Sequence, residues 1–146
     1  MKIYLDNCVL QRPLDDKSQI RIRLEAEAVL SLIEMLQMAD LELISSEVLE
    51  FEIEKTPSSV RRNYANLVLG NAGTRVEINE DLEKRAQDFI KSGVKPLDAL
   101  HLASGEAANV DYFCTCDNRF LRRAQNLSNL RVKVVTPLEL IERLSR

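Results

Sequence analysis

Three aspartates stand where a strand is expected to give way to a helix, and these carboxylates are the clearest candidates for chemistry in this chain. Asp6 ends the first apolar segment, Asp98 is the third residue of a segment that begins at Pro96, and Asp117 follows another apolar segment. If the strands are parallel, all three acids reach the edge where open α/β sheets bind ligands. Because crowded like charges are unfavourable without a cation, the pattern predicts a divalent metal and phosphate chemistry.

Each of these acids also has a simpler structural explanation when it is taken alone. Asp98 lies in the expected first turn of a helix, where the helix dipole favours a carboxylate. Asp117 stands at an N-cap position, and Asp6 can bond its own backbone in a turn. The shared position of all three at the ends of candidate parallel strands favours the functional interpretation.

A fourth acid is expected from the helix that follows the second strand. This stretch carries Glu47, Glu50, Glu52 and Glu54 in alternation with apolar residues. Most of these side chains must be solvated surface charges. Helical spacing puts several of them on different sides, and it does not choose which one joins the aspartates.

The bulk composition predicts one globular domain over residues 1–146. The hydrophobic and charged fractions, 45% and 29%, suit a soluble protein, and we expect neither a signal peptide nor a membrane span. The net charge is −3, so any nucleic-acid contact must come from a local basic patch. Cys114 and Cys116 are expected on one face of a strand as buried free thiols, which together with Cys8 favours a reducing, cytoplasmic location.

Alternating strands and helices predict a three-layer α/β/α sandwich around a mainly parallel sheet. A polar connection over 11–16 is expected to lead to Ser18, which would cap the first helix. The expected strands are 2–6, 41–45, 75–78, 111–116 and 131–135. The expected helices are 20–38, 47–55, 58–70, 80–92, 96–108, 118–125 and one that starts at Pro137.

Four segments, taken in order, give the chain a resemblance to the PIN-domain ribonucleases, including the VapC-type toxins of toxin–antitoxin pairs. The segments are Ile3–Asn7, Ser45–Glu52, Pro96–Ala103 and Thr115–Phe120. No single segment is specific, but their order and spacing are fairly specific, and together they span most of the chain. The resemblance implies a PIN-like fold and metal-dependent hydrolysis of RNA to a 5′-phosphate and a 3′-hydroxyl.

The resemblance also assigns roles to individual acids. It implies Asp6, Glu52, Asp98 and Asp117 as catalytic residues and as ligands of Mg²⁺ or Mn²⁺, with Asp6 and Asp98 as the main ligands. Glu52 follows from counting six residues beyond Ser46, and Glu50 stays open as the alternative acid. A homodimer and a cognate antitoxin that covers the acids are further implications.

Polar residues beside the acids are candidates for other roles in the site. His101 is the only histidine, and its position three residues after Asp98 puts it near the same helix face. We expect a structural or supporting role for it, with a role as a base or phosphate contact as the alternative. The candidate RNA contacts are Asn7, Arg12, Lys95, Arg119, Arg122 and Arg123.

Two other functions compete with a ribonuclease. The first is a PIN-like domain without catalysis that binds protein or RNA. It is favoured by Asn7, where many relatives carry Ser or Thr, and by Arg119, where relatives often carry another acid. The second is a phosphotransfer domain of receiver type, which fits less well because its paired acid and its late lysine would stand elsewhere.

Overall fold

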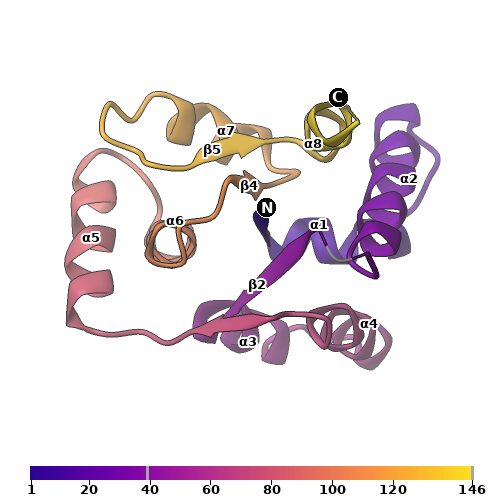
Figure 1. Cartoon of the computed structure of the whole chain (residues 1–146), viewed down its shortest axis with the longest axis horizontal. Coiled ribbons are helices and arrows are strands. Elements are labelled where there is room, and N and C mark those ends of the chain that lie inside the picture. The colour runs from indigo at the N-terminus through magenta and orange to yellow at the C-terminus, as the bar shows by residue number, and fades with distance from the viewer. Residues whose placement is uncertain (39, 146) are drawn as a thin grey trace.

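Five parallel strands form one sheet in the order β3-β2-β1-β4-β5 (Figure 1). The computed structural model describes residues 1–38 and 40–145. The strands are β1 (Lys2–Leu5), β2 (Glu42–Ser46), β3 (Thr74–Val76), β4 (Tyr112–Cys114) and β5 (Lys133–Val135). This architecture confirms the predicted α/β fold with a parallel central sheet.

The helices form layers on the two sides of this sheet. Helices α5 and α6 lie together on one side, and α2 lies beside α8 on the other (Figure 1). In the described ranges no helix combines the length and the apolar character that a bilayer crossing requires. The helices are α1 (Asn7–Gln11), the short 3-10 helix η1 (Arg12–Leu14), α2 (Ile20–Met35), α3 (Glu47–Glu54), α4 (Ser59–Leu69), α5 (Glu80–Lys91), α6 (Pro96–Ala107), α7 (Asn118–Gln125) and α8 (Pro137–Leu144).

Strand β1 is central, and the chain continues from it to both sides of the sheet. It pairs with β2 through Tyr4 and Ile44 and with β4 through Tyr4 and Phe113. Later strands extend outward in the two opposite directions, so the strand order reverses beside β1. Such a reversal leaves a crevice beyond the carboxyl ends of the strands, where ligands of open α/β sheets bind.

An aromatic cluster packs the centre of the sheet. The Tyr4 ring stacks on Phe113 with ring centroids 4.8 Å apart, and Phe120 meets Phe113 edge to face at 5.6 Å. All three side chains are almost completely buried. Because β1, β4 and α7 each contribute one ring, this packing fixes the ends of these elements relative to one another.

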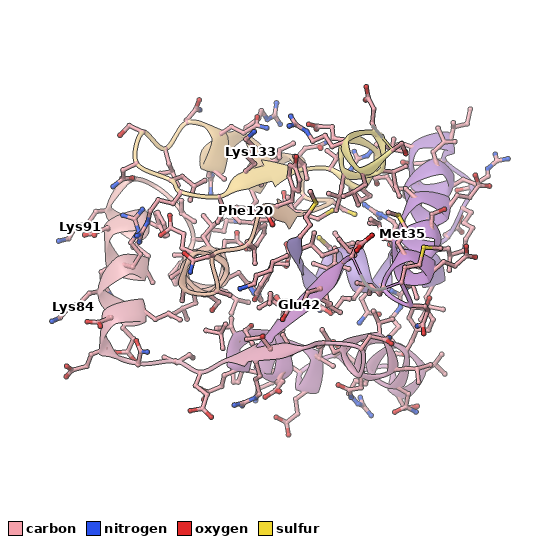
Figure 2. The ribbon with its side chains drawn as sticks, viewed as in Figure 1. Met35, Glu42, Lys84, Lys91, Phe120 and Lys133 are labelled. Carbon is pink, nitrogen blue, oxygen red and sulfur yellow. The ribbon has the colours of Figure 1, made fainter. Side chains whose placement is uncertain are left out.

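Helix α5 illustrates how the outer layer is built. Asn79 caps it by accepting a hydrogen bond from the backbone of Leu82, and Phe89 is buried against the core. Figure 2 shows Lys84 and Lys91 on its outer side, away from the sheet. One apolar stripe and one charged face are what a surface helix requires.

The largest error of the sequence analysis concerns the segment after β1. Residues 11–16 were expected to be a polar connection, but α1 and η1 occupy Asn7 to Leu14. The Asp6 side chain caps α1, and Val9 and Leu10 are buried. Five residues are too few to show a helical period, so the pattern gave no sign of this helix.

Two smaller expectations also differ from the structure. Gln19, and not Ser18, is the N-cap of α2, and it makes no side-chain capping bond. The Ser18 backbone N–H instead donates to Asp16 Oδ1 in a local turn. Strand β4 ends at Cys114, so Cys116 lies beyond the strand, although both thiols are free and buried as expected.

Candidate active site

Asp6 lies at the carboxyl end of the central strand and is almost buried. Its Oδ1 accepts a hydrogen bond from the Asn7 backbone at 2.8 Å, and its Oδ2 accepts one from Thr115 Oγ1 at 3.0 Å. Burial raises the pKa of the Asp6 carboxyl, and the nearby Glu52 charge adds to this, while His101 opposes the rise. A buried carboxylate that accepts hydrogen bonds on both oxygens is held in one orientation at the carboxyl end of β1.

Asp117 is tied to Asp6 through one threonine hydroxyl. Thr115 Oγ1, which donates to Asp6, accepts a hydrogen bond from the Asp117 backbone at 3.1 Å. Asp117 Oδ1 caps α7 by accepting from the backbones of Arg119 and Phe120 at 3.0 and 3.2 Å. Among the described residues its Oδ2 has no hydrogen-bond donor, so this oxygen is available to a ligand.

Asp98 lies in the first turn of α6, directly after the helix opens at Pro96. Burial is the largest cause that raises the pKa of its carboxyl to about 6, and the charges of Asp6, Asp117 and Glu52 add to it. In the described part of the chain no donor contacts this carboxylate. Since the charge of each of the other three acids raises the pKa of Asp98, the four carboxylates belong to one electrostatic site.

Glu52 and Glu50 point to different partners, although both lie on α3. Glu52 Oε1 is 3.2 Å from His101 Nε2, and one ligand atom each from Glu52, His101 and Asp6 lie within 4.8 Å of one another. Glu50 instead accepts two hydrogen bonds of 2.8 Å from Arg75 on β3, which lowers the pKa of Glu50. The structure therefore brings Glu52 to the aspartates and holds Glu50 in an exposed ion pair.

His101 is buried between the acids and the sheet. Its Nδ1 is 2.6 Å from the Tyr4 hydroxyl, and its Nε2 is 4.0 Å from Asp6 Oδ1 as well as close to Glu52. Burial alone would lower the pKa of the imidazole, but the Glu52 hydrogen bond and the surrounding negative charges raise it above its ordinary value. The Tyr4 and Glu52 contacts thus hold the imidazole against the acidic site in one orientation.

The basic candidates for substrate contact fall into two groups. Arg12 is largely enclosed, with its guanidinium bound to Asp15 at 2.8 Å and to Glu25 at 3.1 Å. Lys95, at the N-cap of α6, and Arg119 and Arg122, on α7, are exposed. Lys95 and Arg119 flank the helix ends that carry Asp98 and Asp117, whereas Arg122 lies in the last turn of α7, and contact of the three with a substrate stays a prediction.

The Asn7 amide, another candidate contact, faces along α1. Its Oδ1 accepts a hydrogen bond from Gln11 Nε2 at 3.3 Å, while its backbone N–H is bound to Asp6. Within the structure the side chain therefore already has a partner one helical turn away.

The donor set suits a hard divalent cation. Carboxylate oxygens are the preferred ligands of Mg²⁺ and Mn²⁺, and Mg²⁺ needs only one or two carboxylates per ion because it retains water molecules. Asp98 without a donor and Asp117 with one free oxygen leave ligand positions open. The residues present therefore fit the predicted ion, because a cation would favour the ionised carboxylates, whose burial and mutual repulsion raise the pKa of Asp98.

Sequence reasoning missed two residues that organise this site. Tyr4 was treated only as a strand residue, and Thr115 only as part of a motif, yet they contact His101 and Asp6. A hydroxyl among the apolar residues of an expected strand was the available signal, because such a group needs a hydrogen-bond partner when it is buried.

Fold and site together define an α/β/α protein with an acidic centre at its topological switch point. Residues 3–126 match the family described as the PIN domain. Because this match covers most of the sequence, the chain belongs to the PIN-domain family. The recognition made from the four sequence segments is confirmed. A search among curated proteins finds no significant match to this chain.

Solved structures with the same fold include toxins of the VapC type. A chain of VapBC2 from Rickettsia felis, crystallised with a promoter DNA fragment, superposes with a TM-score of 0.63 at 9% identity over 93% of this chain and 98% of that chain. VapC20 from Mycobacterium tuberculosis, a toxin that cleaves the sarcin-ricin loop, superposes with a TM-score of 0.57 at 14% identity over 88% of this chain and 98% of that chain. PAE2754 from Pyrobaculum aerophilum gives 0.59 at 14% identity over 99% and 90%. At such identities the likeness concerns the fold.

Proposed function

We propose that this protein is a metal-dependent endoribonuclease and the toxin component of a toxin–antitoxin pair. The observation that carries the proposal is the convergence of Asp6, Glu52, Asp98 and Asp117 at the switch point of the sheet, where burial and the charges of the other three acids raise the pKa of Asp98 to about 6. Membership of the PIN-domain family supports the same chemistry. A site that gathers negative charge in this way is suited to a cation and, through it, to a phosphate.

In the proposed mechanism Asp6 and Asp98 would be the main ligands of Mg²⁺ or Mn²⁺, and Glu52 and Asp117 would bind it directly or through water. When bound, such an ion would supply an activated water and charge neutralisation at the scissile phosphate. Thr115 holds Asp6 and the Asp117 backbone in register. Four carboxylates from separate elements thus form one face against which a phosphodiester can be aligned.

The exposed cations provide the complementary contacts to the substrate. Lys95 and Arg119 stand at the helix ends that carry Asp98 and Asp117, and Arg122 lies further along α7, from where these side chains can bind phosphates of the substrate. Because the whole chain carries a net charge of −3, this local patch must supply the attraction for RNA. Binding should therefore weaken steeply as salt is added.

Partners and location belong to the same proposal. One similar structure is a VapBC complex, which supports a cognate antitoxin that covers the acids. We further propose a single PIN-like domain, a homodimer and a cytoplasmic location. The last of these rests on the reduced cysteines of the chain.

The alternative function is a PIN-like domain that binds protein or RNA without cleaving it. Asn7 favours this alternative, since its side chain is hydrogen-bonded to Gln11 and not directed to the acids. Arg119 favours it as well, because a cation stands where an additional acid would help to hold a second ion.

The deciding experiment measures cleavage of a labelled single-stranded RNA with Mg²⁺ or Mn²⁺. Wild type is compared with Asp98→Asn and with the control Asp81→Asn, an exposed acid in the first turn of α5. We expect metal-dependent cleavage to a 5′-phosphate by wild type and the control, and a loss of at least about 100-fold in Asp98→Asn. Metal binding without cleavage of several RNAs, with both ions, would support the binding domain instead.

A further inference from the structure

We propose that Tyr4 and His101 are positioning residues that hold the Glu52 carboxylate for the metal, and that His101 donates a hydrogen bond to Glu52 and does not coordinate the ion. This inference rests on the proposed function of the same site. The geometry alone would permit His101 either to donate a hydrogen bond or to coordinate the ion, because its Nε2 lies close to both the Asp6 and the Glu52 oxygens.

The direction of the hydrogen bonds follows from Ser46, the N-cap of α3. Its Oγ accepts from the Leu49 backbone at 3.0 Å, and its only other partner in the described ranges is the Tyr4 hydroxyl at 2.7 Å. Since Ser46 is completely buried, its hydroxyl hydrogen needs an acceptor, and Tyr4 Oη is the one within reach. Ser46 therefore donates to Tyr4.

The same assignment of donors and acceptors determines which nitrogen of the His101 imidazole carries the hydrogen. Tyr4 uses its phenol hydrogen toward His101 Nδ1, 2.6 Å away, so Nδ1 is an acceptor. A neutral imidazole with an acceptor at Nδ1 carries its hydrogen on Nε2. That hydrogen lies 3.2 Å from Glu52 Oε1 by heavy-atom distance and is donated to it. A nitrogen that bears a hydrogen has no lone pair for a metal.

The consequence is that three buried side chains orient one partly exposed acid. Ser46, Tyr4 and His101 are completely buried, and Tyr4 is further held by its stack on Phe113. The Glu52 side chain is 26% exposed. Hydrogen bonding of Oε1 leaves Oε2 as the oxygen for the ion. Donors of this kind orient metal ligands, and their removal typically weakens metal affinity by about 10- to 100-fold.

The test uses Tyr4→Phe and two substitutions of His101. Tyr4→Phe keeps the ring that stacks on Phe113 but removes the hydroxyl. His101→Gln keeps an N–H donor for Glu52, and His101→Leu removes it. Tyr112→Phe is the matched control, because it removes a strand tyrosine hydroxyl that has no hydrogen bond among the described residues.

Mn²⁺ affinity, measured by calorimetry, is the first readout. We expect Tyr4→Phe and His101→Leu to bind Mn²⁺ about 10- to 100-fold more weakly, with His101→Gln closer to wild type and Tyr112→Phe unchanged. Thermal unfolding without metal identifies variants that are merely unfolded. Equal losses in His101→Gln and His101→Leu would contradict a donor role.

The second readout is the imidazole itself, which is unambiguous because the sequence has one histidine. In a long-range ¹H–¹⁵N spectrum we expect Nε2 to carry a hydrogen both without metal and at saturating Mg²⁺. A hydrogen that leaves Nε2 when Mg²⁺ binds would overturn the inference in favour of coordination by His101.

The two proposals fail separately. Wild-type protein that binds Mn²⁺ with the expected imidazole spectrum but cleaves no RNA contradicts the proposed nuclease and leaves the positioning role supported. If wild type binds no metal, the nuclease proposal fails, and an unprotonated Nε2 in the metal-free protein would overturn the positioning role as well.

Discussion

Replacement of Asp98 by Asn should make the metal-free protein more stable while it destroys the site. The pKa of the Asp98 carboxyl is about 6 in the folded protein against an ordinary 3.8, chiefly through burial and the charges of Asp6, Asp117 and Glu52. A raised folded-state pKa means that ionisation opposes folding. The destabilisation is therefore absent below about pH 4 and complete above about pH 6.

The size of the effect follows from the same shift. Taken at face value, the difference in pKa corresponds to about 3 kcal/mol, but the Asp98 carboxylate is only partly buried, and solvent screening reduces this to about 1–2 kcal/mol. Asn also gives up a favourable interaction with the α6 dipole of about 0.3–1 kcal/mol. We expect a net gain of about 1 kcal/mol at pH 8, or about 2–4 °C in melting temperature.

Urea unfolding at pH 8 and at pH 4, without divalent metal, measures this gain. The difference between Asp98→Asn and wild type should shrink at pH 4, where Asp98 is largely protonated in the folded protein. Mg²⁺ should then stabilise wild type, because ligands that bind only the folded state do so, and should stabilise the variant much less.

The control for this prediction is Asp81→Asn, which removes an exposed carboxylate from the first turn of α5. It loses the dipole interaction without relieving the acidic site, so it should be neutral or slightly destabilising at both pH values. A metal-free Asp98→Asn that is less stable than wild type at pH 8 would refute the claim that ionisation of Asp98 opposes folding.

Three further predictions separate the roles of individual side chains. Glu52→Gln should lower RNA cleavage by at least about 100-fold. Glu50→Gln should keep activity and should hardly change the melting temperature, because an exposed ion pair contributes little to stability; cleavage rates and melting temperatures test both. Glu106→Ala removes the buried partner of Arg85, 2.6 Å away, and should lower the free energy of unfolding by about 3–5 kcal/mol in urea titrations. Arg122→Gln should weaken RNA binding and reduce its salt dependence by about one unit of slope, measured by fluorescence anisotropy across salt concentrations.

The sequence was sufficient to predict where the aspartates meet, because that placement depends on topology alone. Once the strands are parallel, an acid at each carboxyl end must reach the same edge, and Asp6 and Asp117 do so across the paired strands β1 and β4. Capping signals were also local enough to read. Ser46, Asn79 and Asp117 each cap the helix that was expected from them.

The remaining features depend on contacts between distant residues. The choice between Glu50 and Glu52 cannot be made within α3, because it is Arg75 on β3 that binds Glu50 and His101 on α6 that contacts Glu52. The Tyr4 hydroxyl meets an imidazole 97 positions away. No periodicity encodes such a pair, so only the folded chain reveals it.

The donors around the site separate one acid from the other three. Asp6, Glu52 and Asp117 each have an oxygen already held in the metal-free protein, by Thr115, by His101 and by the α7 backbone. The carboxylate of Asp98 has no donor among the described residues, and burial together with the charges of the other acids raises its pKa to about 6. An incoming cation should therefore find three oriented carboxylates and draw in the fourth. The stability gained on metal binding should include a contribution from Asp98, because the ion relieves the repulsion on that carboxylate.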